Sequence, residues 1–331
     1  MRLTVKTNGG FLACALSCLL VAPGASAKTL RLGLITPPSH SWTQAAHNLA
    51  RDIESSSGGR HKMIVYPSRQ LGNEAQMLQL MQTGALDMAI LTAAEVSNRI
   101  PEFGALYTPY LARNIEQAAL VLRGRVAASL LDLLPEEIGV IGLGYGMAGL
   151  RQILSTIPVT SLADIQGRKL RITPFEPIRD FYKLAGVAPT PMPLASVYDA
   201  LANGQIDMLD MDLELILKLK YHELSDTLVI SNHMMFPSVA MLSGKVWIRL
   251  SEEDQQMISQ LTAKHMDWVI DQAVHEEAAW QAGVRNLETG LNIIDVGPEF
   301  FGNTAADWEA IWALKAGVIS ALRAELENEA N

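Results

Sequence analysis

An arginine at the end of a predicted strand is the residue whose chemistry the sequence indicates most directly. Arg171 lies in the run Gly-Arg-Lys-Leu-Arg-Ile at 167–172, and helical and extended segments follow it as far as a strand-like run at 206–211. A planar guanidinium can donate two parallel hydrogen bonds to a carboxylate, which a lysine ammonium cannot do. Arg171 therefore predicts an anion-binding site, and binding rather than turnover is the first hypothesis.

Sites for other chemistry are poorly supported. Residues 144–149 read Gly-Tyr-Gly-Met-Ala-Gly after a strand, like a dinucleotide-binding loop, but Pro158 leaves no room for the helix that should follow. Asp207, Asp210 and Asp212 could hold a hard cation, yet strand alternation sends Asp207 to the opposite face. The sequence has no HxxxH pair, no GxSxG elbow and no recognisable set for an exported hydrolase or lyase. We therefore expect no metal, no cofactor and no enzyme activity.

The N-terminus has the three parts of a secretory signal peptide. Arg2 and Lys6 make it basic, residues 11–22 are apolar, and small residues lead to Ala27. The apolar stretch is too short to span a bilayer, which takes roughly 20 residues. We predict cleavage after Ala27 and a soluble, exported mature chain, with the bacterial periplasm as its compartment.

Both cysteines, Cys14 and Cys18, lie in the segment that cleavage removes, so a hydrophobic core without disulfides must supply the stability. The alternative is a lipoprotein acylated at Cys18, but Ala-Leu-Ser-Cys at 15–18 is a poor lipobox. The formal charge of −9 becomes −11 when the two basic residues of the signal peptide leave. Because no basic cluster exceeds the one at 168–171, nucleic acid is excluded as a partner.

Strands and helices alternate along the mature chain, which predicts an α/β protein with mostly parallel, helix-covered sheets. We expect strands at 29–35, 61–66, 86–92 and 138–143, and helices at 41–55, with Ser41 as its cap, and from residue 73. The pattern begins again at residue 161, which indicates two lobes. A helix at 252–287 is long enough to brace both lobes, and a strand at 291–296 and a helix at 304–326 follow it.

Several short strings, each weak alone, stand in a characteristic order and spacing. The first half has Gly-Gly-Arg at 58–60, Tyr-Pro at 66–67, Gln-Leu-Gly-Asn-Glu at 70–74, Gly-Ala-Leu-Asp-Met at 84–88 and Tyr-Thr-Pro-Tyr-Leu at 107–111. The second half has Gly-Leu-Arg at 149–151, Leu-Ala-Asp-Ile-Gln-Gly-Arg-Lys-Leu-Arg at 162–171, Pro-Thr-Pro at 189–191 and Val-Tyr-Asp-Ala-Leu-Ala-Asn-Gly-Gln-Ile-Asp at 197–207. Over nearly the whole mature chain they resemble the DctP-like solute receptors of tripartite ATP-independent periplasmic (TRAP) transporters.

The resemblance implies a two-lobed periplasmic-binding-protein fold of type II-like form, with the ligand cleft between the lobes and a long C-terminal helix bracing both. We expect a signal peptide at 1–27, lobe I at 28–148 plus 237–276, and lobe II at 149–236 plus 277–331. The implied function is to capture an organic acid and deliver it to the small and large subunits of a TRAP membrane permease. A ligand sensor that presents its cargo to a signalling receptor would use the same pocket and remains the alternative.

The resemblance also implies roles for two arginines. Arg171 matches the arginine that forms a two-pronged salt bridge with the ligand carboxylate, and Arg151 matches one that often adds a second contact. The alternative for either arginine is an ion pair with a protein acid such as Asp210.

Further pocket positions follow from the same resemblance. Many members have Glu-Asn where this chain has Asp210 and Met211, so a cargo less polar or smaller than a sugar acid is expected. Thr92 matches a polar position that meets ligand hydroxyls, and His40, after the first strand, is a further candidate. Phe236 and its neighbour Met235 are candidates for the apolar side of the pocket, with core packing as the alternative.

Overall fold

The computed structural model describes residues 1, 4, 27–288 and 290–329. The strands are β1 (Lys28–Leu34), β2 (His61–Tyr66), β3 (Met88–Thr92), β4 (Val140–Leu150), β5 (Gln152–Ser155), β6 (Lys169–Ile172), β7 (Ala188–Pro191), β8 (Met208–Met211), β9 (Thr227–Ile230), β10 (Met235–Ser243) and β11 (Asn292–Asp295). The α-helices are α1 (Ser41–Ser56), α2 (Glu74–Thr83), α3 (Ala93–Ser97), α4 (Ile115–Arg123), α5 (Arg125–Leu131), α6 (Leu134–Ile138), α7 (Leu162–Ile165), α8 (Glu176–Leu184), α9 (Val197–Ala202), α10 (Leu213–Lys218), α11 (Gly244–Trp247), α12 (Glu252–Arg285), α13 (Thr304–Trp312) and α14 (Ile319–Glu329). Short 3-10 helices are η1 (Pro101–Tyr107), η2 (Leu194–Ser196), η3 (Tyr221–Leu224) and η4 (Pro298–Phe301).

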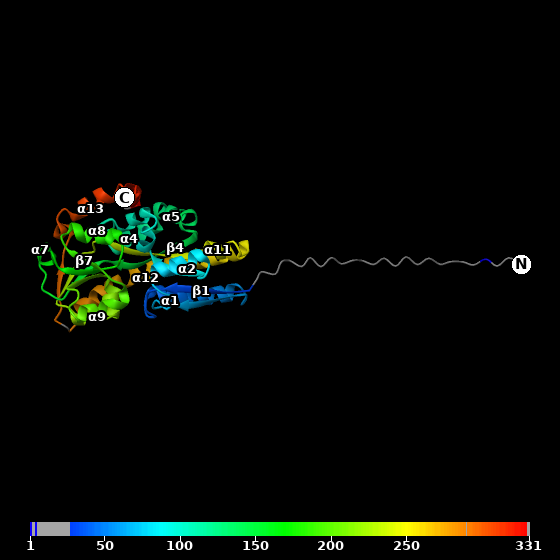
Figure 1. Ribbon diagram of the computed structural model, residues 1–331, viewed down its shortest axis with the longest axis horizontal. Coiled ribbons are helices and arrows are strands. Elements are labelled where there is room, and N and C mark those ends of the chain that lie inside the picture. Colours follow the sequence, from blue (N-terminus) through cyan, green and yellow to red (C-terminus); the bar gives the residue numbers. More distant parts are fainter. Residues whose placement is uncertain (2–3, 5–26, 289, 330–331) are drawn as a thin grey trace.

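The strands form two sheets that lie side by side (Figure 1). One sheet has the order β2-β1-β3-β10-β4 and the other the order β11-β9-β5-β8-β6-β7. Elements β1, α2 and α11 mark one side of the molecule, and α7, β7 and α9 mark the other. The α/β class and the two-lobed fold expected from the sequence are confirmed. The predicted signal peptide, apart from its last residue Ala27, falls almost entirely outside the described residues, so that prediction stays untested.

Both sheets are mostly parallel, as the sequence predicted, with one strand reversed in each. Strand β10 is antiparallel to β3 and β4, and β5 is antiparallel to β8 and β9. These are the two strands that enter a sheet directly from the other one, β5 after β4 and β10 after β9. Each of these strands begins beside the other sheet, at the point where the parallel strands of its own sheet end. It therefore runs antiparallel to them.

The two crossing segments are tied together by backbone hydrogen bonds. Arg151 is the one residue between β4 and β5, and its amide donates to the carbonyl of Met234, which precedes β10, at 2.8 Å. Gly149, two residues earlier, has φ of 106°, a left-handed conformation that glycine adopts without the steric penalty of a Cβ. The site predicted around Arg151 therefore lies at the junction of the two sheets.

Helix α12 braces the structure, as the sequence predicted. It is 34 residues long, starts with the side chain of Ser251 as its cap, and carries three acids in its first turn, where they complement the helix dipole. It packs on α1 and on β4, which belongs to the first sheet. It also packs on α10, which follows β8 of the second sheet. Within the described part of the chain, no helix combines the length and the apolar character that a membrane span needs.

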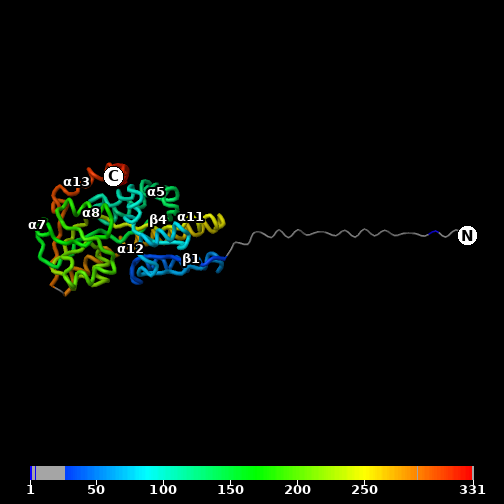
Figure 2. The backbone as a smooth tube through the Cα atoms, in the orientation of Figure 1, coloured from blue at the N-terminus to red at the C-terminus, as the bar shows by residue number. Residues whose placement is uncertain are grey.

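The last predicted helix is wrong in one respect, because the segment 304–326 is divided into α13 and α14. The break contains Gly317, and glycine disfavours a helix by about 1 kcal/mol relative to alanine. The break lets the chain change direction: α13 packs on α8, whereas α14 packs on α4 and α5. Figure 2 shows the red C-terminal segment beside α5.

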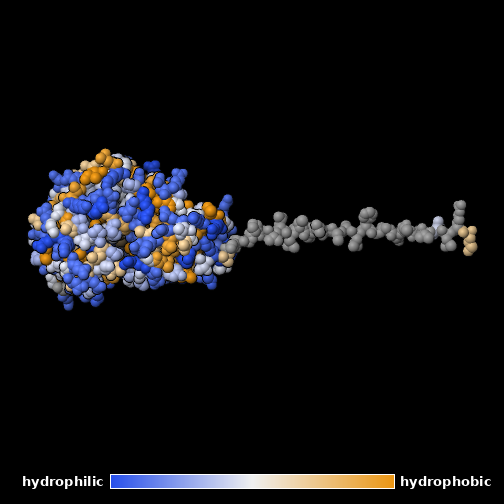
Figure 3. Space-filling view, viewed as in Figure 1, coloured by the Kyte–Doolittle hydropathy of each residue, from blue (hydrophilic) through white to orange (hydrophobic). Residues whose placement is uncertain are grey.

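The surface and the interior differ in the expected way. The face seen in Figure 3 is largely hydrophilic, with scattered hydrophobic residues. The most exposed large apolar side chain of the folded part is Leu314, at 90 %, in the break between α13 and α14. Most strand residues are buried, including all of β3, β8 and β10.

The contact between η1 and α13 predicts a large effect of a small substitution. A Cβ on Gly104 would lie 2.1 Å from Cζ3 of Trp312, whose buried ring also stacks on Trp308. Gly104→Ala should therefore lower the free energy of unfolding by about 1–3 kcal/mol, the usual cost of overpacking a core. Gly317→Ala is the control, because its Cβ would meet no atom within 4 Å. Equal midpoints in urea unfolding for both variants would contradict the packing described.

Candidate functional site

Four strand ends surround the junction of the two sheets. β1 and β3 end at Leu34 and Thr92, and β6 and β8 end at Ile172 and Met211. In α/β proteins, ligands bind in the crevice outside the carboxyl ends of strands, where side chains and free backbone groups face one another. Arg171 in β6 and the Asp210–Met211 end of β8 therefore lie where a ligand site is expected.

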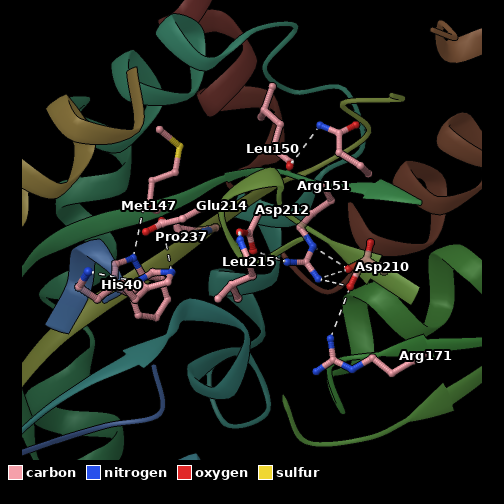
Figure 4. Close-up of polar contacts among 12 residues, drawn as sticks. His40, Met147, Leu150, Arg151, Arg171, Asp210, Asp212, Glu214, Leu215 and Pro237 are labelled. Atoms are coloured by element: carbon pink, nitrogen blue, oxygen red, sulfur yellow. Dashed lines mark hydrogen bonds and ion pairs between the residues drawn. The ribbon is translucent and has the colours of Figure 1, made fainter. Parts of the chain in front are cut away.

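Arg151 is bound to two aspartates. Its Nε donates to Oδ1 of Asp210 at 2.6 Å, its Nη1 to Oδ2 of Asp212 at 3.1 Å, and its Nη2 to the carbonyl oxygen of Asp210 at 2.5 Å (Figure 4). Its guanidinium carbon lies 4.3 Å from the centre of the Phe236 ring. All four side chains are buried. For Arg151, the pairing with protein acids that the sequence left open is therefore present.

Arg171 is buried to the same degree but has no carboxylate partner among the described residues. It is 1 % exposed, and its Nε donates to the carbonyl oxygen of Met192 at 3.0 Å and its Nη1 to that of Asp210 at 3.4 Å. Its Nη2 is buried without a hydrogen-bond partner in the described structure. Burial, and next the charge of Arg151, lowers the pKa of Arg171 to about 10, so it stays cationic at neutral pH. It thus presents a positive charge and a spare donor.

Asp210 is the link between the arginines. Besides Arg151, its carboxylate accepts a hydrogen bond from the hydroxyl of Tyr182 at 2.9 Å and lies 3.1 Å from Nε2 of His233. Burial alone would raise the pKa of Asp210, but Arg151 and His233 outweigh burial and hold the pKa well below its usual range. Asp210 therefore stays ionised and fixes the position of both guanidinium groups, one through its carboxylate and the other through its carbonyl.

An inner cavity of about 30 Å³ brings most of the predicted residues together. His40, Thr92, Arg151, Arg171 and Met211 all line it. Asp210 does not line it and lies behind Arg151 instead. The sequence did not single out other residues of its wall, such as Trp42, Thr173 and Leu194, and it considered Asp212 only as a cation ligand, but it did propose Phe236 as an apolar wall residue.

An outer cavity of about 480 Å³ adjoins the inner one, since Ile35, Thr173 and Leu194 line both. Its remaining wall includes Arg69 and Glu74, from the segment after β2. In the sequence, Glu74 and the residues on either side of Arg69 contributed only to the resemblance, and neither Arg69 nor Glu74 was placed in the site. The sequence signal that could have placed Arg69 and Glu74 in the site was their position shortly after the end of a strand, where ligand sites are common.

Ser231, His233 and Asp210 have the distances of a hydrolase triad. The Oγ of Ser231 lies 2.8 Å from Nδ1 of His233, and Nε2 of His233 lies 3.1 Å from Oδ2 of Asp210. However, all three are buried, none lines the inner or the outer cavity, and Phe181 stacks on the histidine with ring centres 5.3 Å apart. A catalytic group must reach its substrate, so we interpret this array as the support that holds Asp210.

His40 connects the two halves of the site. It, rather than Ser41, caps α1, with Nδ1 accepting from the amide of Trp42 at 3.1 Å, and its Nε2 lies 3.4 Å from a carboxylate oxygen of Glu214 on α10. The amide and hydroxyl of Ser41 also donate to Glu214, at 3.1 and 3.2 Å, and so does Lys218, at 2.7 Å. The N-terminus of α1 and the helix α10 are thus joined by charge and hydrogen bonds.

Thr92 has a structural task in addition to lining the cavity. Its hydroxyl caps α3 by accepting from the amide of Glu95 at 3.1 Å. Its own amide donates to Glu74 at 2.6 Å. Burial, acting against these hydrogen bonds, raises the pKa of Glu74 to about 7, so this carboxyl is partly protonated near neutral pH and can donate as well as accept.

The described residues contain no group of three or more His, Cys, Asp or Glu side chains arranged to hold a metal ion. Asp207 lies apart from Asp210 and Asp212, as strand alternation predicted, and accepts from the amide of Lys169 at 2.9 Å. Among the described residues, the inner cavity combines the uncompensated guanidinium of Arg171 with an apolar and hydrogen-bonding wall.

Comparison with known proteins identifies the family of this chain. The family model described as "bacterial extracellular solute-binding protein, family 7" (DctP) matches residues 32–314. The chain belongs to this family. The chain is also similar to the sialic acid-binding periplasmic protein SiaP of Vibrio cholerae, which is 28 % identical over 239 residues, 72 % of this chain and 74 % of SiaP.

Solved structures of solute-binding proteins have the same fold. A TRAP periplasmic solute-binding protein from Polaromonas sp. JS666, bound to D-erythronate, matches with a TM-score of 0.83 and 26 % identity over 89 % of this chain and 98 % of its own. The sugar acid binding protein DctPAm from Advenella mimigardefordensis, in complex with galactonate, matches with a TM-score of 0.85 over 92 % of this chain and 99 % of its own. At 24 % identity, the second match concerns the fold alone.

The burial of His40 predicts a dependence of stability on pH. Burial, which outweighs the opposing effect of Glu214, lowers the pKa of His40 to about 4 from its ordinary value of 6.5. The unfolded chain takes up the proton first as the pH falls, so stability present above pH 6.5 is lost towards pH 4, by about 3 kcal/mol for such a shift. His40→Asn, which keeps a helix-capping residue, should show a weaker dependence of the free energy of unfolding on pH over this range.

The control for this measurement is His275→Asn, because the side chain of His275 is 79 % exposed. This variant should keep the wild-type slope in urea unfolding between pH 6.5 and pH 4. A loss of packing in His40→Asn would lower stability at every pH and leave the slope unchanged. If His40→Asn retains the wild-type dependence of the free energy of unfolding on pH, the buried neutral histidine is not the cause of that dependence.

Proposed function

We propose that this protein is a periplasmic solute-binding protein that captures an organic acid by its carboxylate in the cleft between two lobes and delivers it to a TRAP membrane permease. The observation that carries the proposal is Arg171, a buried guanidinium with a donor that no described protein group satisfies. An unpaired buried charge is costly, so such a group persists where a ligand compensates it. In this proposal the protein binds its cargo and does not transform it.

Arg171 is positioned before the ligand arrives. Two backbone carbonyls, of Met192 and Asp210, hold the guanidinium through Nε and Nη1. The third nitrogen, Nη2, is then the main contact for a ligand oxygen. Arg151 lies beside it in the cavity wall, and because Asp210 and Asp212 occupy its donors, we propose that it adds positive potential and rigidity more than a full two-pronged salt bridge.

We propose the lobe division 28–148 plus 237–276 and 149–236 plus 277–331. Bonds such as the one between Ser41 and Glu214 then join the lobes when the cleft is closed. Closure around an acid removes water from Arg171 and strengthens the ion pair, because charges attract more strongly at low dielectric. Helix α12, which packs on elements of both lobes, is the element that bends or pivots, and α14 reaches across to pack on α4 and α5.

The chemical class of the cargo follows from the same residue. D-erythronate in the Polaromonas relative is a carboxylate, and SiaP is a sialic acid-binding protein. Arg171 is suited to the shared carboxylate. Met211, Trp42 and Phe236 make the inner wall around it apolar, so the atoms next to the carboxylate have little opportunity for hydrogen bonding there.

Different effects of the two arginines test the proposal. Arg171→Gln should reduce affinity for the best acid at least 100-fold, since truncating one partner of a buried charge pair costs about 2–5 kcal/mol. It should leave the stability of the ligand-free protein unchanged or raised, because the lost group had no carboxylate partner. Arg151→Gln should instead lower the stability of the ligand-free protein by about 3–5 kcal/mol, because it leaves Asp210 and Asp212 unpaired.

The measurement is isothermal titration calorimetry, together with thermal shifts, against monocarboxylates, dicarboxylates, keto acids, sugar acids and their neutral esters or sugars. Arg171→Lys keeps the charge without the planar fork and should recover only part of the affinity. Arg249→Gln, at an exposed position after α11, is the control and should behave like wild type. Equal stabilisation by neutral analogues, or unchanged affinity in Arg171→Gln, would exclude the carboxylate site.

Delivery to a permease predicts a requirement for the loaded protein. Vesicles that contain the small and large subunits of the cognate TRAP permease should take up the radiolabelled acid only when the purified mature protein is added outside. The Arg171→Gln protein should not support uptake. Binding without uptake, together with a sensor kinase as the only membrane neighbour of the gene, would favour the sensing alternative.

A further inference from the structure

Arg69 is a further cation at the cleft, and the binding function proposed above does not use it. It lies in the turn between β2 and α2 and lines the outer cavity together with Ile35 and Leu194. The same three residues also line a neighbouring cavity of about 280 Å³. Its side chain is half-buried, and its Nε is buried without a hydrogen-bond partner among the described residues. The guanidinium forms no ion pair within the described part of the chain.

The backbone holds Arg69 at the rim of the cavity. Ser68 and Arg69 have φ of 53° and 63°, a left-handed conformation that non-glycine residues adopt at a cost of about 1–2 kcal/mol each. Their amides donate to the carbonyls of Thr36 at 2.9 Å and Leu34 at 3.1 Å, at the end of β1. The turn is therefore fastened to the strand that ends at the site, and the side chain starts from a fixed point.

The other charged groups of the outer cavity have partners. Arg99 forms an ion pair with Glu95, and its guanidinium also donates to the carbonyl of that residue at 3.4 Å. Glu74 accepts from the amide of Thr92 at 2.6 Å, and burial raises its pKa towards neutrality, which reduces its negative charge. Among the described residues of this wall, Arg69 is the cation that has no protein anion. The outer cavity therefore favours a negatively charged group at Arg69.

We propose that Arg69 forms a second anion-binding subsite, and that the cargo is an acid with two anionic groups, one carboxylate at Arg171 and a second carboxylate at Arg69. This inference rests on the proposed function, because it takes the Arg171 end as given. The inner and outer cavities meet at Ile35, Thr173 and Leu194, so a single extended molecule can reach both arginines. The outer volume of about 480 Å³ is within the range of sites for small molecules.

Matched pairs of acids that differ only at the far end test the subsite. Galactonate and galactarate share six carbons and the arrangement of their hydroxyl groups, but the second ends in a carboxylate where the first has an alcohol. Pentanoate with glutarate and hexanoate with adipate make the same comparison without hydroxyl groups. Titration calorimetry of the wild-type protein should give at least one pair in which the diacid binds about ten-fold or more tightly than the monoacid.

Substitution of Arg69 should remove this preference. Arg69→Gln should lower affinity for the diacid about ten-fold more than affinity for the monoacid, and Arg69→Glu should make the diacid the weaker ligand of the pair. The preference of the wild type should also decrease at high salt, because Arg69 is only half-buried. Arg249→Gln, which removes an exposed charge away from the cavities, should keep the wild-type ratio.

The outcomes separate the two proposals. If acids bind through Arg171 but no pair shows a preference for the diacid, or if Arg69→Gln leaves the ratio unchanged, the subsite is wrong and the carboxylate site at Arg171 stands. If no acid in the pairs or in the wider screen binds in a way that depends on Arg171, the proposed function itself is wrong, and the subsite with it. A folded state of Arg69→Gln like that of the wild type, checked by circular dichroism and urea unfolding, assigns the change to binding.

Discussion

The buried ion cluster of Arg151 with Asp210 and Asp212 is the interaction on which the rest of the site depends. Both aspartate side chains pair with the guanidinium of Arg151. The neighbouring Arg171 therefore donates only to backbone carbonyls. Asp212 also caps α10, because its Oδ1 accepts a hydrogen bond from the amide of Leu215 at 2.9 Å. Breaking such a cluster leaves uncompensated charge in the interior, which makes its geometry difficult to change. The proposed selectivity for anions rests on the unequal distribution of these acids between two adjacent arginines.

The crossing of the chain between the sheets explains why this cluster can form. Arg151 lies between β4 and β5, and its partners lie at the end of β8, to which β5 is antiparallel, with Ile153 opposite Asp210. Arg171 in β6 is opposite Leu209 of the same strand. One strand, β8, thus determines the positions of both guanidinium groups. The strands of the first sheet end opposite this point, so Thr92 and the residues after β1 complete the wall.

Local sequence patterns predicted the elements well where a local interaction determines them. The strand at 61–66 is present with the same bounds, and α2 begins after Asn73, whose side chain forms a capping box with Gln76. Predictions that needed distant contacts were less accurate. The predicted last helix is divided so that its second part packs on α4 and α5, and α1 is capped by His40, whose other ring nitrogen faces Glu214, distant in sequence.

The amino-acid sequence by itself determined the alternation of strands and helices, the long α12 and the presence of a guanidinium at the end of β6, because hydrophobic periodicity and capping act over a few residues. Only the tertiary structure decided which arginine is neutralised. The partners of Arg151 are 59 and 61 residues away along the chain, and nothing near residues 151 or 171 in the sequence indicates which of the two they contact. The packing of β5 and β6 on either side of β8 made that choice, since it brings both aspartates to Arg151 and turns only carbonyls towards Arg171.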